Sequence, residues 1–127
     1  MHKLVLSVFV LMLGAGTAIA ACPSNPPSSS KVNFHSNDQK VNAQWLQQNL
    51  AGKKVHFDGG VEQYHKNGSY IYKSDGGSFK APAYRFYDNG ARCIDYDQPR
   101  FDFYVINSGK LVLINSQGGR YEAKKIR

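Results

Sequence analysis

From residue 53 onward, hydrophobic and polar residues alternate in short runs. A period of two is typical of β-strands with one buried face, because successive side chains of a strand point to opposite sides of the sheet. The runs predict eight strands, at residues 54–57, 61–65, 69–73, 80–87, 91–96, 100–106, 110–114 and 119–124.

Short segments rich in Gly, Asn and Asp separate these runs. The clearest is Asn89-Gly90, a pair typical of two-residue hairpin turns because both residues tolerate positive φ. Connections this short permit only antiparallel neighbours. We therefore expect a mainly β fold, an eight-stranded antiparallel meander that closes into a small barrel or a strongly curved sheet, since closure removes the exposed sheet edges.

The preceding residues, 38–50, follow a helical period instead. Ser36 begins a capping-box pattern, and Gly52 stands where a helix commonly ends. These features predict one N-terminal α-helix packed at one end or face of the sheet, with Trp45 covering the core. The residues at helical spacing are Val41, Trp45, Leu46 and Leu50.

The alternation also predicts a core on one face of the strands and residual apolar character on the other, where a partner or the helix would dock. The expected core residues are Phe57, Tyr84, Phe86, Phe101, Phe103, Val105, Leu111 and Leu113. The apolar residues of the second face are Tyr104, Ile106, Val112 and Ile114.

The start of the chain has the order of an export signal: a basic residue, an apolar run and a small-residue cleavage site. We interpret residues 1–20 as a signal peptide, residues 21–37 as a Pro/Ser-rich linker and residues 38–127 as a single helix-plus-β domain. The expected location is the bacterial periplasm or the exterior of the cell.

Two interpretations of Cys22 remain open. In an oxidising compartment it pairs with Cys93, and this disulfide stabilises the fold by roughly 2–4 kcal/mol. Alternatively, the sequence ending at Cys22 resembles a lipobox, so that a lipidated Cys22 anchors the protein to a membrane. Against that second interpretation, Ile19 replaces the preferred Leu and Pro23 follows the cysteine directly.

The composition indicates a basic protein. Lys3 is the one Lys or Arg of the signal, so residues 21–127 carry 15 Lys and Arg against 9 Asp and Glu, a formal net charge of +6. Such an excess favours anionic partners, but the charges are scattered except at residues 124–127. We expect a monomer that binds an unknown protein or glycan, with nucleic acid an improbable partner and a membrane contacted only through a lipidated Cys22.

The sequence contains no phosphate-binding loop, nucleophile elbow or Cys-x-x-Cys pair. The remaining cluster with metal-binding chemistry is His56, Asp58, Glu62 and His65, whose spacing is not diagnostic, so neither a metal nor a cofactor is predicted. Asp95, Asp97 and Asp102 are interpreted as a solvated strand face and turn. A non-enzymatic protein is the expectation.

Tyrosine and arginine on the predicted strands are the feature that best indicates binding, because rigid rings and guanidinium groups recur at recognition surfaces. An alternative is that these tyrosines are simply good strand residues. The candidate ligand- or partner-binding residues are Tyr72, Arg85, Tyr87, Arg92, Tyr96 and Tyr104.

The leading hypothesis is an exported domain that binds a protein, glycan or amphiphilic ligand through this aromatic and basic surface. The alternative is an inhibitor of an exported or invading enzyme, acting through a loop such as residues 75–77 or 97–99; a small hydrolase is a more distant third.

The layout is similar to that of small calycin-like barrels, and the size and export signal are similar to those of bacterial lysozyme inhibitors. No motif of either group matches residues here, so the similarity is one of architecture.

Overall fold

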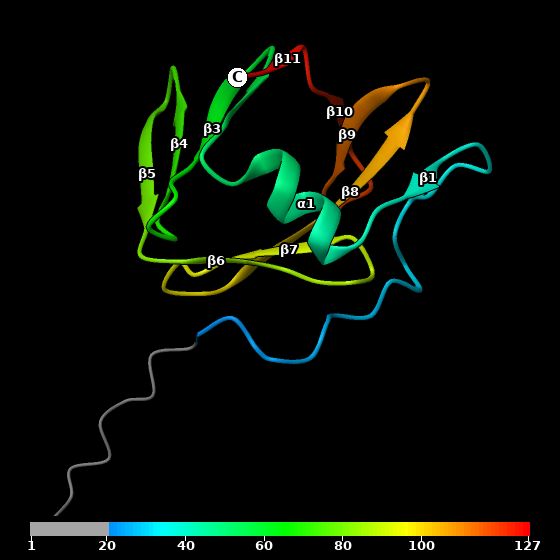
Figure 1. Ribbon diagram of the computed structural model, residues 1–127, viewed down its shortest axis with the longest axis horizontal. Coiled ribbons are helices and arrows are strands. Elements are labelled where there is room, and N and C mark those ends of the chain that lie inside the picture. Colours follow the sequence, from blue (N-terminus) through cyan, green and yellow to red (C-terminus); the bar gives the residue numbers. More distant parts are fainter. Residues whose placement is uncertain (1–20) are drawn as a thin grey trace, which may run out of the picture.

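The computed structural model describes residues 21–127 (Figure 1), so the predicted signal peptide lies outside the described residues. This part of the chain forms eleven strands and one helix, and the strands make two antiparallel sheets. The expected mainly β, antiparallel class with one helix is therefore confirmed. Within residues 21–127 the strands do not form the single closed barrel that the alternation suggested.

We call the two sheets sheet I and sheet II. Sheet I has the order β11-β2-β3-β4-β5, and its strands are β2 (Lys54–Phe57), β3 (Gly60–Tyr64), β4 (Tyr70–Ser74), β5 (Gly77–Ala81) and β11 (Lys125–Ile126). Sheet II has the order β10-β9-β8-β7-β6, and its strands are β6 (Tyr84–Phe86), β7 (Ala91–Ile94), β8 (Arg100–Asn107), β9 (Lys110–Ile114) and β10 (Arg120–Glu122). A short strand, β1 (Gln39–Lys40), also pairs with β8.

The chain passes between the sheets at two corners. The predicted strand 80–87 is broken at Pro82, which has no N–H to donate to a ladder, so β5 pairs with β4 while β6 pairs with β7. At the second corner, the N–H of Ala123 donates to Leu111 of sheet II, whereas the N–H of the next residue, Lys124, donates to His56 of sheet I. Bent strands of this kind join sheets that pack face to face.

The helix α1 (Ala43–Leu50) lies between the two sheets in Figure 1. Its N-cap is Asn42, whose side chain accepts a 2.9 Å hydrogen bond from the N–H of Trp45. The predicted start at residue 38, capped by Ser36, is wrong because residues 39–40 extend and pair with β8. The predicted end at Leu50 is confirmed, and Gly52 has the expected positive φ of 77°.

The apolar side chains form two separate clusters. The inner cluster lies between the sheets and includes Leu46 and Leu50 of the helix; the outer cluster lies on the other face of sheet II. The strand register pairs Val105 with Val112 and Tyr104 with Leu113. The prediction that Val105 and Leu113 share one core is therefore wrong, because neighbouring strands place them on opposite faces. Half-buried members of the predicted core are Phe57, Tyr84, Phe86 and Phe101.

Residues 21–37, the N-terminal segment, cover the outer cluster. The predicted disulfide between Cys22 and Cys93 is confirmed, with the two Cα atoms 5.9 Å apart. Phe34 meets the edge of Phe103, and the hydroxyl of Tyr87 donates a 2.7 Å hydrogen bond to the carbonyl of Pro23. The disulfide fits an oxidising extracellular compartment. It also occupies the sulfur that a lipid anchor on Cys22 would require.

A partly buried ion pair holds the end of the N-terminal segment. Arg120 of β10 donates to both carboxylate oxygens of Asp38, at 2.7 and 2.8 Å, and to the carbonyl of Asn33. The hydrogen bond from Arg120 is the main cause that holds the pKa of Asp38 well below its usual value.

In residues 21–127 no helix is long and apolar enough to cross a membrane.

Candidate functional site

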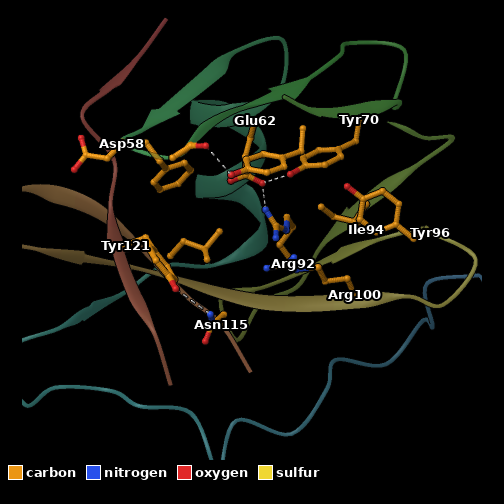
Figure 2. Close-up of a pocket in the computed structure, with 13 residues that line it drawn as sticks. Asp58, Glu62, Tyr70, Arg92, Ile94, Tyr96, Arg100, Asn115 and Tyr121 are labelled. Atoms are coloured by element: carbon orange, nitrogen blue, oxygen red, sulfur yellow. Dashed lines mark hydrogen bonds and ion pairs between the residues drawn. The ribbon is translucent and has the colours of Figure 1, made fainter. Parts of the chain in front are cut away.

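A cavity of about 420 Å³ lies between the two sheets. Its walls come from the strands β2, β3 and β4 of sheet I and β7, β8, β9 and β10 of sheet II, together with adjoining turns, and α1 contributes none of them. Figure 2 shows the polar side chains that converge on it. The lining residues are Phe57, Asp58, Gly59, Glu62, Tyr70, Tyr72, Arg92, Ile94, Tyr96, Arg100, Leu113, Asn115 and Tyr121.

Arg92 links the two sheets through ion pairs at the inner end of this cavity. One terminal nitrogen, Nη1, pairs with Glu62 of β3, and the other, Nη2, pairs with Asp102 of β8. The register of β7 and β8 places Arg92 directly opposite Asp102. All three side chains are at most 3% exposed. Buried charges are tolerated only when each is paired, which explains why the three occur together.

Three phenol groups complete the coordination of Glu62. The hydroxyls of Tyr64, Tyr70 and Tyr104 donate to its carboxylate, and the hydroxyls of Tyr64 and Tyr104 also lie 2.6 Å apart. With Arg92, this gives Glu62 four donors. Burial raises the pKa of each phenol well above its usual value. The three tyrosines therefore remain protonated donors.

Arg92 itself remains a cation. Burial acts to lower its pKa, but the negative charge of Glu62 and the surrounding phenols outweigh burial, so the pKa of Arg92 is raised. Its guanidinium carbon also lies 5.6 Å from the ring centroid of Tyr70 and 5.5 Å from that of Tyr104. We refer to Glu62, Arg92, Asp102 and the three tyrosines as the buried polar network.

Arg100 lies where this network reaches solvent. Its Nε and Nη2 donate to the two oxygens of Asp102, at 2.9 and 3.3 Å, and these hydrogen bonds raise its pKa. The other three N–H bonds of its guanidinium have no partner within residues 21–127. The Arg100 side chain is 56% exposed, and Tyr121, on the other side of the cavity in Figure 2, is 51% exposed. A molecule that enters the cavity therefore meets a positive charge with N–H groups that can still donate hydrogen bonds.

The six predicted binding residues divide between two places. Tyr72, Arg92 and Tyr96 line the cavity, and Tyr104 lies behind Arg92 in the buried polar network. Arg85 and Tyr87 instead belong to the outer side of sheet II: Arg85 is paired in register with Cys93 and stacks over the Tyr87 ring at 5.6 Å. The alternation of side chains along the chain accounts for this division. Phe86 packs on the inner cluster, so its neighbours Arg85 and Tyr87 point to the outer side.

Sequence reasoning missed the burial of the carboxylates. The interpretation of Asp102 as a solvated residue is wrong, since Asp102 is 1% exposed and paired with Arg92. One signal for its burial was available: Asp102 lies two residues before Tyr104 on the same predicted strand, so the two side chains share one face, and Tyr104 is buried. Glu62, considered above as a metal ligand, points into the cavity instead. Among residues 21–127 no three His, Cys, Asp or Glu side chains lie close enough together to hold a metal ion.

Comparison with protein families, with curated proteins and with solved structures finds no match to this chain. Its function must therefore be inferred from the geometry described above.

Proposed function

We propose that this protein is an exported, non-enzymatic domain that binds a small amphiphilic ligand in the cavity between its sheets. The observation that carries the proposal is a cavity of about 420 Å³ whose walls combine aromatic and aliphatic side chains with fixed polar groups. Binding sites for small molecules commonly have this composition and a volume of about 300–1,000 Å³. The bent strands at both corners hold the two sheets face to face around that cavity.

The lining divides into two chemical regions. Apolar surface comes from Phe57, Ile94 and Leu113, with the rings of Tyr72 and Tyr96 beside it. The N–H groups of Arg100 that bond no group in residues 21–127 supply hydrogen-bond donors and positive charge near solvent. The matching ligand has an aromatic or aliphatic body and a carboxylate, sulfonate or similar acceptor at one end.

A binding role is also supported by what the cavity presents chemically. Its lining contains no histidine, cysteine or serine. Glu62 receives four donors from the chain itself, so its carboxylate oxygens are already occupied by Arg92 and three tyrosines. A hollow interior favours ligand binding over inhibition by a loop such as residues 75–77, for which a filled interior is expected.

A fluorescent dye with the proposed chemistry, anilinonaphthalene sulfonate, tests this function. We expect the purified chain to bind it, with amide chemical-shift changes at Tyr96, Arg100 and Tyr121. Arg100→Gln should weaken binding by roughly tenfold, the value of one charge-assisted hydrogen bond. Arg85→Gln is the matched control, because Arg85 is exposed on the outer face of sheet II. Equal affinities of the two variants, or shift changes confined to other residues, would contradict the proposal.

A further inference from the structure

The outer face of sheet I carries five cationic side chains and no acidic side chain. The register across its five strands gives two rows of outward-facing residues. The first row is Arg127, Lys54, Gln63, Ile71 and Lys80, in which Arg127 and Lys54 exchange backbone hydrogen bonds. The second row is Lys125, His56, Val61, Lys73 and Ser78. We call these ten residues the basic face.

The cations of the basic face are exposed and form no ion pair within residues 21–127. Elsewhere the chain does pair cations with carboxylates, as in Lys110 with Glu122 and Arg120 with Asp38. Desolvation and then the charges of Lys125, Arg127 and Lys54 lower the pKa of His56. The positive potential of this face is therefore not compensated by its neighbours.

The basic face has no Phe, Tyr or Trp side chain. Alternation turns Tyr64, Tyr70 and Tyr72 to the inner side of sheet I, and the centre of the outer side is formed by Val61 and Ile71. Proteins that bind single-stranded nucleic acid commonly stack bases on the rings of Phe, Tyr or Trp, and this face offers none of these three. The cations spread over about 19 Å across the strands and about 7 Å along them, from ordinary strand spacings. A two-dimensional array of point charges matches a two-dimensional array of phosphates.

We propose that the basic face docks the protein on a membrane surface of anionic phospholipid. The interaction is electrostatic: lysine side chains approach the headgroup phosphates while the sheet lies parallel to the surface. The sequence alone allowed membrane contact only through a lipidated Cys22, and the basic face provides a route that leaves the disulfide intact. The cavity lies on the opposite side of sheet I, so docking is independent of the ligand proposed above.

Vesicle co-sedimentation tests the docking. The full exported chain is mixed at low salt with vesicles of phosphatidylglycerol and phosphatidylcholine in equal amounts, or of phosphatidylcholine alone. The test variant is Lys73→Gln/Lys80→Gln/Lys125→Gln. The matched control, Lys31→Gln/Lys40→Gln/Lys110→Gln, changes three exposed lysines elsewhere. Both variants lower the formal net charge of residues 21–127 from +6 to +3. The control also removes the exposed ion pair between Lys110 and Glu122, which lies outside the basic face.

We expect binding to the anionic vesicles only, with partitioning that falls at high salt and falls about a hundredfold in the test variant, from the usual contribution of each lysine near an anionic surface. The control variant should lose less than about tenfold, from the general loss of charge. Equal losses in both variants would overturn the proposal. So would binding to a DNA duplex through the same lysines without binding to vesicles. Arg100→Gln should bind vesicles like the unmodified chain, so failure of the cavity proposal is recognised separately.

Discussion

At the scale of single residues, Arg92 is the one cation among residues 21–127 that is fully buried. It is a buried cation between two buried carboxylates that come from different sheets. Tyrosine and arginine content alone was enough to select Arg92, Tyr72 and Tyr96 as candidates. It was not enough to select Glu62 and Asp102, because acidic residues on strands ordinarily face water and are buried only when a cation is brought to them.

Replacing Arg92 therefore tests the buried polar network. Arg92→Leu should lower the free energy of unfolding by about 3–5 kcal/mol, because buried Glu62 loses the cation that pairs with it and Asp102 retains only the half-exposed Arg100. Arg85→Leu, on the adjacent strand but exposed, should change it by no more than about 0.5 kcal/mol. Urea unfolding measures both. A loss below about 1 kcal/mol for Arg92→Leu would show that the network contributes little to stability.

At the scale of elements, the N-terminal segment acts as a third layer on sheet II. Its Pro- and Ser-rich composition indicated a linker, yet Val32 and Phe34 pack on the outer cluster and Cys22 joins Cys93 at its centre. A polar, proline-rich segment cannot form a core by itself. It covers one here because the disulfide and a few apolar side chains hold it against a preformed sheet.

The double variant Cys22→Ala/Cys93→Ala should be less stable by roughly 2–4 kcal/mol, because the unfolded chain regains the freedom of a long loop. Hydrogen exchange should increase first at Tyr87 and Ala91, whose outer side the segment covers. Phe34→Ala, which keeps the disulfide, should lose less stability and serves as the comparison. Identical denaturation curves with and without reductant would contradict this role for the disulfide.

At the scale of the whole molecule, the two sheets, the helix and the N-terminal segment enclose polar groups as well as apolar ones. The inner cluster and the buried polar network share Tyr64, Tyr70 and Tyr104. The stability of the fold is thereby coupled to the protonation of these phenols.

This coupling predicts a loss of stability at alkaline pH. A raised folded-state pKa means that the folded chain keeps protons that the unfolded chain releases above about pH 10. The contribution of these phenols to the free energy of unfolding should therefore be constant below that pH and fall as the pH rises above it. Urea unfolding across this range measures the fall, and Tyr104→Phe should make it shallower. If all eight tyrosines ionise with one ordinary midpoint while the chain stays folded, the prediction fails.

The sequence by itself determined the local features: strands from alternation, antiparallel pairing from short turns, the end of the helix from Gly52 and the disulfide from two cysteines in a chain predicted to be exported. Only the tertiary structure decided the break at Pro82, the start of the helix and the separation of Val105 from Leu113. Alternation shows that the two faces of a strand differ, but here both faces of sheet II are covered, so it could not tell which residues meet. The cavity depends on side chains from strands far apart in the chain, and their meeting is set by register and packing.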